Sequence, residues 1–504
     1  MDNQIKSSME PPYVLEQYLN LLKANGLVAD YKIQEENLKR EVDFLTYDSK
    51  EVQKNTLFVC KGIHFLEKYL ISAVENGAFC YVSEKKYESD FDYIIVKDIR
   101  QTMALLANLF YEEPWRNLNL IGITGTKGKS TTTYFVHSIL DHYLKRVNKP
   151  LSAIVSGIDT YDGVISEESH LTTPEAMMLQ RHFRNAVNSG IEYLTMEVSS
   201  QALKYNRVQG TVFDIGCFLN IGEDHISDAE HRDFDDYFES KLMLFAQSST
   251  ACINLDSNHI EEVLYSAEGC ERIITFGTTD KAEVYGSRII KKKEGISFIV
   301  RTPSFEQEFL LTMPGLFNVE NALAAIAICY ALHIPTDDIY EGLRWARVSG
   351  RMEVYQNKDK NVTVIVDYAH NRLSFEKLYA SIREEYPDCH MVSIFGCPGG
   401  KAFRRRQELG EIAARYAKKV YLTEEDAGEE SVDEISNEIA NYIKAQNCPF
   451  EIIEDRETCI RKAIDEAEEN TVILLTGKGR ETRQKRGTQY VDYPSDVECV
   501  EKYL

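Results

Sequence analysis

A glycine-rich segment with the sequence GITGTKGKSTTT, at residues 122–133, holds residue types that bind phosphate groups. The strict phosphate loop, G-x-x-x-x-G-K-[ST], would need a glycine at position 123, where this chain has Ile123. An apolar strand pattern precedes the segment and a helical pattern follows it, so backbone N–H groups at the helix start would face an anion. Lys129 could then neutralise phosphate charge, while Ser130 or Thr131 could reach a metal ion. The segment therefore predicts a phosphate site rather than a plain glycine-rich turn.

Two polar residues that end or follow apolar strand patterns could hold a cation. Glu197 ends one pattern, and a carboxylate in that place can bind Mg²⁺ in an α/β sheet. His225 follows the next pattern. Taken alone, a glutamate at a strand end is more often solvated, and a single histidine is more often structural. From these segments alone, both interpretations stay open.

Lys241 lies on a helical pattern whose neighbouring positions are aromatic or apolar. The residues three and four positions away are Tyr237, Phe238, Leu244 and Phe245. A lysine on such a face is costly unless its ammonium group reaches water or is chemically changed. Burial lowers the pKa of a lysine and favours the neutral amine, which can react with carbon dioxide to give a carbamate, an anionic metal ligand. Within this segment alone, a lysine that snorkels to water is the simpler interpretation.

Composition narrows the class of protein. The chain has 504 residues, of which 43% are hydrophobic and 27% charged, which is typical of a globular protein of about three domains. Its net charge of -23 argues against nucleic acid as a partner, because the polyanion would be repelled. No stretch reaches the ~18 apolar residues of a membrane span, and no basic region with an apolar run opens the chain. The eleven cysteines lack C-x-x-C spacing, so we predict reduced thiols in the cytoplasm.

Strand and helix patterns alternate along the chain, which is typical of parallel α/β sheets. The strand candidates lie at 56–60, 93–98, 118–124, 191–198, 213–221, 251–256, 272–277, 362–369, 391–397, 419–425 and 471–477. A helical pattern begins at Leu15, and Pro114 breaks another. We expect three domains, at 1–114, 115–348 and 349–504, and the last should be a second, smaller doubly wound domain.

Many segments, in order along the chain, resemble the motifs of the Mur ligases, the ATP-dependent amide-forming enzymes of peptidoglycan precursor synthesis. The resemblance is greatest to their tripeptide-forming MurE branch. The segments are YDSKEVQKNTLFVCKG (47–62), TGTKGKST (124–131), TTPE (172–175), EVSSQAL (197–203), NIGEDH (220–225), YFESKLMLF (237–245), GLFNVENALAA (315–325), SGRMEV (349–354), VDYAHN (366–371) and GKGRE (477–481). The family's phosphate loop lacks the strict opening glycine, and Gly122 and Gly125 would bracket that place and ease the turn.

The resemblance covers nearly the whole chain and implies an architecture. It implies an N-terminal α/β domain that binds the uridine nucleotide, a central P-loop-type ATPase domain with a parallel sheet, and a C-terminal Rossmann-like domain that binds the amino acid.

The resemblance also implies roles for single residues. The residues implied to bind ATP are Gly125, Thr126, Lys127, Gly128, Lys129, Ser130, Thr131, Asn318, Asn321, Arg351, Asp367 and His370. The residues implied to place a pair of Mg²⁺ ions are Ser130, Glu197, His225 and carbamylated Lys241. The residues implied to contact the UDP-sugar peptide are Ser49, Thr172, Thr173, Ser199 and Arg207. The catalytic set is Lys129, Glu197, His225, Lys241 and Arg351.

The amino-acid site departs from the family pattern. Enzymes of this branch that use meso-diaminopimelate carry D-N-P-R, whose arginine pairs with the distal carboxylate, and lysine-using relatives tend to lack that arginine. Here the four places hold Glu425, Asp426, Ala427 and Gly428. Without the arginine, a distal carboxylate has no bidentate partner, whereas an acidic cluster could attract a distal ammonium group. The residues we expect at the amino-acid site are Arg406, Glu425, Asp426, Glu430, Gly477 and Glu481. One of Arg404, Arg405 and Arg406 would bind the α-carboxylate, and Glu481 would bind the amine. A solvated acidic loop is the open alternative.

The sequence thus predicts a cytoplasmic, monomeric ligase that adds a diamino acid, with L-lysine favoured, to UDP-N-acetylmuramoyl-L-alanyl-D-glutamate through an acyl phosphate. Its expected partners are small molecules only, with ATP and Mg²⁺ required. Two alternatives remain. One is a ligase of the folylpolyglutamate synthetase branch, which shares the ATP core but lacks an N-terminal domain of this type. The other is a nucleotide-binding paralogue without catalytic activity.

Overall fold

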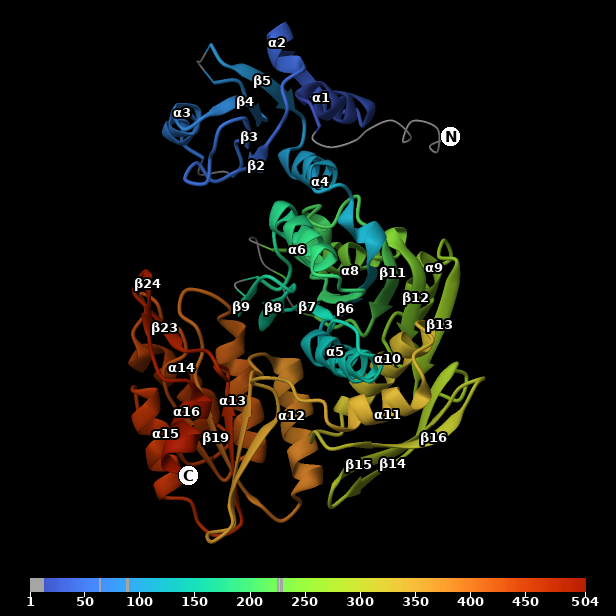
Figure 1. The fold of residues 1–504 in the computed structure, drawn as a ribbon. Helices are drawn as coiled ribbons and strands as arrows, with labels where there is room; N and C mark the ends of the chain where they lie inside the picture. Colours follow the sequence, from blue (N-terminus) through green and yellow to red (C-terminus); the bar gives the residue numbers. More distant parts are fainter. Residues whose placement is uncertain (1–12, 63–64, 88–89, 170, 224–225, 227–229) are drawn as a thin grey trace. The chain divides into compact units, whose positions relative to one another are not determined.

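The computed structural model describes residues 13–62, 65–87, 90–169, 171–223, 226 and 230–504 (Figure 1). The chain divides into two compact units. The first unit contains the chain up to Lys129 together with Tyr143–Thr275, and the second contains Ser130–His142 together with Phe276–Leu504. Most strands of the chain pair in parallel and alternate with helices, so the prediction of an α/β fold is confirmed. No helix of the described part is both long and apolar enough to cross a membrane.

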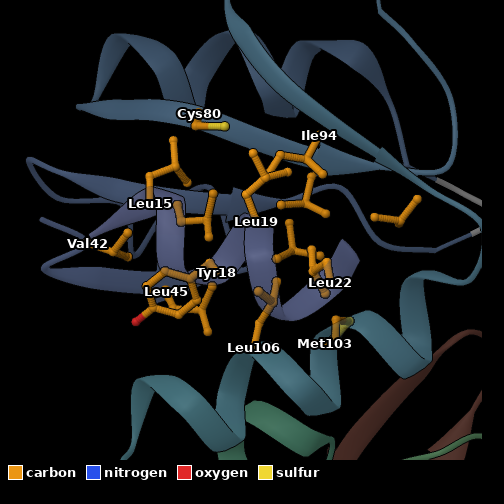
Figure 2. Packing of buried hydrophobic residues seen from close by; sticks show 14 of the residues in the cluster. Leu15, Tyr18, Leu19, Leu22, Val42, Leu45, Cys80, Ile94, Met103 and Leu106 are labelled. Atoms are coloured by element: carbon orange, nitrogen blue, oxygen red, sulfur yellow. The ribbon is translucent and has the colours of Figure 1, made fainter. Parts of the chain in front are cut away.

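The first sheet of unit one has the strand order β1-β5-β4-β3-β2, and only β1 is antiparallel to its neighbour. Its strands are β1 (Val28–Lys32), β2 (Phe44–Thr46), β3 (Thr56–Val59), β4 (Ala78–Ser83) and β5 (Asp92–Val96). Its helices are α1 (Leu15–Ala24), α2 (Glu35–Leu38), α3 (Glu67–Glu75) and α4 (Ile99–Phe110). Leu15, Tyr18, Leu19 and Leu22 of α1 are buried at helical spacing beside Ile94 of β5 (Figure 2).

The second sheet of unit one runs β13-β12-β11-β6-β10-β7-β8-β9, and its strands from β12 to β7 are parallel. The strands are β6 (Asn119–Thr124), β7 (Ala153–Val155), β8 (Asp159–Tyr161), β9 (Ser166–Glu168), β10 (Tyr193–Glu197), β11 (Phe213–Phe218), β12 (Ser248–Asn254) and β13 (Arg272–Gly277). The helical segments along this part of the chain are η1 (Pro114–Asn117), α5 (Lys129–Arg146), α6 (Ala176–Asn188), α7 (Ser200–Lys204), α8 (Phe234–Leu242), η2 (Phe245–Gln247) and α9 (Ile260–Ser266), and Ser130–His142 of α5 belongs to unit two. Because β6 lies between β10 and β11, its carboxyl end is a switch point of the sheet, where ligands bind in such folds.

Besides Ser130–His142 of α5, unit two contains an antiparallel β-meander, β14 (Val284–Lys292), β15 (Gly295–Arg301) and β16 (Glu306–Leu311). Two helices follow, α10 (Asn318–Ala331) and α11 (Thr336–Arg344). Eleven residues of α10 are buried, in keeping with its almost continuous apolar sequence.

The last sheet runs β17-β18-β22-β19-β20-β21, parallel except for β17. Its strands are β17 (Glu353–Asn357), β18 (Val362–Asp367), β19 (His390–Phe395), β20 (Lys419–Leu422), β21 (Phe450–Ile452) and β22 (Thr471–Thr476), and a separate hairpin has β23 (Arg483–Arg486) and β24 (Gln489–Asp492). The helices are α12 (Arg372–Glu385), α13 (Arg404–Tyr416), α14 (Val432–Lys444), α15 (Arg456–Asp465) and α16 (Asp496–Tyr503). Helices α12, α13 and α14 pack in a row, while α15 packs on α16, and β22 lies at the switch point. The division points at residues 114 and 348 stay predictions.

Candidate active site

The phosphate segment is the turn between β6 and α5. Ile123 lies inside β6, fully buried, and pairs with Glu197 of β10, so position 123 is still strand and needs no glycine. Gly122 also lies in β6, where an added Cβ would come within 2.8 Å of the Phe213 ring. The expectation that Gly122 eases the turn is therefore wrong, because Gly122 lies in the strand before the turn. Its small size instead makes room for the Phe213 side chain. The turn itself relies on Gly128, which precedes α5 with a left-handed φ of 87°.

Asn220 holds this loop in place, although sequence reasoning gave it no role. Its Nδ2 donates to the carbonyl of Lys127 at 3.0 Å, and its Oδ1 accepts from the Lys127 N–H at 2.9 Å. The Asn220 carbonyl also accepts from the Thr126 N–H at 3.0 Å. Asn220 follows the carboxyl end of β11, next to β6, and it is the first residue of the NIGEDH segment. That position is the signal that could have identified it.

Two lysines meet at one carbonyl of the loop. The Nζ of Lys129 donates to the Gly125 carbonyl at 3.0 Å, and the Nζ of Lys241 donates to the same oxygen at 2.9 Å. Lys241 is 1% exposed and does not snorkel to water, so that interpretation is wrong. Its ammonium group lies 4.6 Å from the ring centre of Tyr237, whose hydroxyl donates to Thr126 Oγ1 at 3.1 Å.

Glu197 pairs in the sheet with Ile123 of the phosphate segment. It ends β10 and is 2% exposed. Its Oε1 accepts from the Gly157 N–H at 2.7 Å, and among the described residues no hydrogen bond reaches Oε2. A buried carboxylate oxygen without a donor at the carboxyl end of a parallel sheet fits a hard cation such as Mg²⁺. His225 lies outside the described residues, and within the described ones no group of three or more His, Cys, Asp or Glu could hold a metal.

The residues expected at the sugar peptide gather beside Glu197. Thr173 Oγ1 donates to the Glu197 carbonyl at 2.9 Å and accepts from the Ser199 N–H at 3.0 Å. Arg207 Nη1 donates to the Thr173 carbonyl at 3.0 Å. A Cβ added at Gly157 would lie 3.3 Å from Thr172 Oγ1, so Thr172 also faces this region.

Two ion pairs of Glu175, which sequence reasoning missed, join Arg207 to the first sheet. Glu175 pairs with Arg207 at 3.0 Å and with Lys61 at 2.6 Å. Lys61 follows β3, and Ser49 follows the neighbouring parallel strand β2. The carboxyl ends of parallel strands meet at one edge, so Ser49 and Lys61 share that edge.

In unit two, Arg351, Asp367 and His370 lie together at the carboxyl end of β18. The carboxylate of Asp367 accepts from the Met352 N–H at 3.0 Å and from the Ala369 N–H at 2.8 Å. Burial raises the pKa of Asp367, and Arg351 and these two N–H groups oppose that rise. Arg351 lies 4.9 Å from the ring centre of Tyr368, whose carbonyl accepts from His370 Nδ1 at 2.8 Å.

The other residues expected at ATP lie at helix starts of unit two. Asn321 Nδ2 donates to Asn318 Oδ1 at 3.0 Å in the first turn of α10, and Asn318 Nδ2 donates to the Pro314 carbonyl at 2.7 Å. Both asparagines are buried. Ser130 and Thr131 lie in the first turn of α5, where Thr131 is buried and Ser130 is partly exposed.

Glu425 differs from the other acids of the expected amino-acid site. It follows β20 and is 8% exposed, and no hydrogen bond to its carboxyl group comes from the described residues. Burial raises the pKa of Glu425 to about 8, against the opposing charges of Arg456 and Lys478. Gly477 follows β22 directly opposite, since an added Cβ there would lie 2.2 Å from Glu425 Oε2. Glu425 is therefore a buried carboxyl group with no hydrogen-bonded or ion-paired partner among the described residues.

The neighbouring acids already have cationic partners. Asp426 pairs with Lys478 at 3.1 Å, and Glu481 pairs with the same ammonium group at 2.6 Å. Glu481 also accepts from the Tyr368 hydroxyl at 2.6 Å, which joins this region to the Arg351 group. Lys478 is the second residue of GKGRE and is 3% exposed, and sequence reasoning gave it no role.

Arg406 is also occupied. Its guanidinium group is 5% exposed and pairs with Glu430 and, at 2.6 Å, with Glu438. Gly428, at the place of the family's arginine, has a left-handed φ of 61°, and its N–H donates to the Lys485 carbonyl at 2.9 Å. A side chain at position 428 would strain this backbone. Only Glu425 thus remains as a buried acid of this segment without a hydrogen-bonded partner in the described part.

Comparison with known proteins places these sites in a family context. Residues 123–329 match the Mur ligase middle domain, and residues 350–479 match the Mur ligase, glutamate ligase domain. A UDP-N-acetylmuramyl-tripeptide synthetase of Ligilactobacillus salivarius is 36% identical, over 96% of this chain and 98% of the relative. An L-lysine ligase acting on UDP-N-acetylmuramoyl-L-alanyl-D-glutamate, from Enterococcus faecalis, is 37% identical over 92% of each chain. The corresponding 2,6-diaminopimelate ligase of Clostridioides difficile is 35% identical, over 92% of this chain and 96% of the relative.

Solved structures share the fold. The structure of a UDP-N-acetylmuramoyl-L-alanyl-D-glutamate–2,6-diaminopimelate ligase matches with a TM-score of 0.67 at 20% identity, over 97% of this chain and 98% of that one. MurF ligase from Thermotoga maritima in complex with ADP matches with a TM-score of 0.62 at 19% identity, over 86% and 94%. Relatives that use lysine and relatives that use diaminopimelate are thus about equally similar to this chain, and the choice between the two amino acids depends on the site itself.

Proposed function

Because this chain belongs to the Mur ligase family, of the MurE type, we propose that it joins L-lysine, in preference to meso-diaminopimelate, to UDP-N-acetylmuramoyl-L-alanyl-D-glutamate. Enzymes of this family form amide bonds with ATP, and this chain is an ATP-dependent ligase. Ligase relatives of this identity over nearly the whole chain favour this function over the folylpolyglutamate branch and over a paralogue without activity.

The observation that carries the lysine preference is the buried carboxyl group of Glu425 beside Gly477. The ε-ammonium group of lysine is a cation near neutral pH and would supply the charge partner that Glu425 lacks. The distal carboxylate of diaminopimelate would need a cation, and the family's arginine is replaced by Gly428. Lys478 is engaged by Asp426 and Glu481 and is a poor substitute.

The proposed reaction proceeds through an acyl phosphate. A carboxylate is a poor acyl donor, because its leaving group would be oxide. Transfer of the γ-phosphoryl group of ATP to the glutamyl carboxylate releases ADP and makes phosphate the leaving group. The amine of the amino acid then attacks the acyl carbon, and the tetrahedral intermediate expels phosphate while the nitrogen loses a proton. Lys129 and Arg351 are the proposed cations that stabilise charge on the phosphoryl group.

Mg²⁺ would neutralise phosphate charge. The buried Glu197 carboxylate, whose Oε2 has no donor among the described residues, supports Glu197 as a ligand, and Ser130 is the second ligand that the family resemblance implies. We further propose that Lys241 is carbamylated and, together with His225, places a second ion. The neutral amine of Lys241 would attack carbon dioxide and lose a proton. The carbamate nitrogen keeps one hydrogen, so the bond to the Gly125 carbonyl, now 2.9 Å from Nζ, could persist.

The substrate-binding roles follow from the same proposal. In unit one, Ser49 would contact the uridine nucleotide. The proposed contacts of the sugar peptide are Thr172, Thr173, Ser199 and Arg207. The proposed contacts of the ATP phosphates are Gly125, Thr126, Lys127, Gly128, Lys129, Ser130 and Thr131. The proposed contacts of the adenosine part are Asn318, Asn321, Asp367 and His370.

At the amino acid, Glu481 would bind the α-amine. For the α-carboxylate we propose Arg405 or Arg406. Glu430 and Glu438 already pair with the two Nη atoms of Arg406, which favours Arg405. Arg405 is partly exposed, and its charge lowers the pKa of Glu425.

A substrate panel tests the proposal. The enzyme is given the UDP-sugar dipeptide, ATP and Mg²⁺, with lysine, ornithine or meso-diaminopimelate in separate reactions, and phosphate release and product mass are measured. We expect the highest kcat/KM with lysine. A preference for diaminopimelate would overturn the proposed specificity, and no product with any diamino acid would overturn the proposed reaction.

A further inference from the structure

A fully buried ion pair lies behind the proposed amino-acid site. Arg456 begins α15 and Asp496 begins α16, and the side chain of each is 1% exposed. The guanidinium Nε donates to Asp496 Oδ1 at 2.6 Å, and Nη2 donates to Oδ2 at 2.8 Å. This is a two-point, planar pairing, the geometry in which a buried pair best offsets the cost of desolvation.

Arg456 of this pair also binds the backbone of two loops, the one that contains Glu425 and the one that contains Gly477. Arg456 Nη2 donates to the Thr476 carbonyl at 2.8 Å, and Nη1 donates to the Glu424 carbonyl at 3.4 Å. These carbonyls directly precede Gly477 and Glu425 in the chain. The guanidinium group of Arg456 thus fixes the backbone directly before Glu425 and directly before Gly477.

Asp496 holds the remainder of the GKGRE loop. Its Oδ2 accepts from the Gly479 N–H at 3.1 Å, and its own N–H donates to the Gly479 carbonyl at 3.1 Å. Gly479 lies two positions after Gly477 in the chain. The loop is therefore anchored on both sides of the glycine that faces Glu425.

Arg456 also acts on Glu425 through its charge. It is the largest of the charges that oppose the raised pKa of Glu425. The other charged or titratable groups that face this carboxyl are Lys478, Arg405, Asp426, Cys397 and Tyr368. The guanidinium group of Arg456 is also bonded to the carbonyl of residue 424, next to Glu425 in the chain.

We propose that Arg456 and Asp496 are positioning residues of the amino-acid site, which fix the loops at 424–425 and 476–479 so that Glu425 faces the distal ammonium group of the substrate. The pair touches no substrate and acts through Glu425. The inference rests on the proposed function, because it assumes that the amino acid binds at Glu425.

The test separates the KM for the amino acid from the KM values for ATP and for the UDP-sugar dipeptide. The variants are Arg456→Lys, which keeps a cation but loses the planar fork, and Asp496→Asn, which keeps the shape but loses the anion. The control is Lys419→Gln, which removes the ion pairs of Lys419 with Glu451 and Glu466 at the amino end of β20. Thermal melting of each purified variant reports whether it folds.

We expect the KM for the amino acid to rise at least about tenfold in both variants, the effect of a small misplacement of a binding group. The other two KM values should stay within about twofold, and the control should leave all three unchanged. In Arg456→Lys the pH at which the amino-acid KM improves should also shift, which a purely structural role would not produce. The idea fails if the folded variants keep the amino-acid KM of the wild type, or if all three KM values rise together.

The assay uses whichever diamino acid the wild-type enzyme accepts best. If the proposed preference for lysine is wrong, the wild-type enzyme alone shows this, before any variant is compared. Normal amino-acid KM values in both variants, from an enzyme that does use lysine, would overturn only the positioning role.

Discussion

Glu425 should make the affinity for L-lysine depend on pH. Burial raises the pKa of this carboxyl group to about 8, so only about one molecule in ten carries the charged form at pH 7. The ε-ammonium group binds the charged form, and the apparent affinity falls with the fraction of the competent form. The KM for lysine should therefore fall about fivefold from pH 7 to pH 8, and by less than about twofold from pH 8 to pH 9.

The Glu425→Gln variant isolates this effect. The amide keeps the shape of the side chain but carries no charge, so its KM for lysine should lack the trend. At pH 8.5 that KM should exceed the wild-type value by about 10- to 100-fold, the worth of a hydrogen bond between charged groups. Glu429→Gln is the matched control, because Glu429 is an exposed acid of the same segment.

Stability should move in the opposite direction. The folded-state pKa of Glu425 lies above its usual value, so between pH 4.5 and 8 the folded state holds a proton that the unfolded state has lost. The wild type thus loses stability as pH rises through this window, by about 2–5 kcal/mol, whereas Glu425→Gln does not. At pH 9 the variant should melt at a higher temperature than the wild type without substrate.

The measurements are initial rates of phosphate release at fixed ATP and UDP-sugar dipeptide, with lysine varied from pH 6.5 to 9, and thermal melting in the same buffers. Two results would refute the reasoning. One is a lysine KM with the same pH profile in the wild type and in Glu425→Gln. The other is a lower melting temperature of the variant at pH 9.

Three further predictions concern unit one. Lys241→Ala should lose most activity and regain part of it when small carboxylates are added, since these could replace the carbamate; a fully active variant would refute the carbamate. Asn220→Ala removes two side-chain hydrogen bonds from the phosphate loop and should raise the KM for ATP about tenfold, while the lysine KM stays the same. Gly122→Ala forces a methyl group to within 2.8 Å of the Phe213 ring and should lower the free energy of unfolding by about 1–3 kcal/mol, measured by urea denaturation.

Sequence patterns located the unit-one residues well, because the relevant side chains follow strand ends. Glu197 ends an apolar strand pattern, and the carboxyl ends of parallel strands meet at one edge. Alternation predicted the strand, and the parallel sheet then fixed the place of Glu197 beside the phosphate loop. The burial of Lys241 also followed from its aromatic neighbours, but its partner did not. That partner is a backbone carbonyl 116 positions away, and no local pattern encodes it.

The Arg456–Asp496 pair shows what remains hidden in a sequence. The two residues are 40 positions apart and come from different helices. One sign was available, because Arg456 is the first residue of α15, where the helix dipole disfavours a cation. A basic residue in that place must be stabilised by something else, and a buried acid is one way to do so. Neither its partner nor the loops it holds could be read from that sign.

The acidic run at 424–430 shows why counting charges was not enough. Sequence reasoning treated its acids as one cluster that attracts cations. In the fold, Asp426 is balanced by Lys478 and Glu430 by Arg406, and Glu429 lies exposed, so these acids gain little from a further cation. Glu425 is desolvated without a hydrogen-bonded partner in the described part of the chain. A bound ammonium group would restore the interaction that burial removed. The acid whose burial most lowers the stability of the substrate-free protein is therefore the one that can best select the substrate.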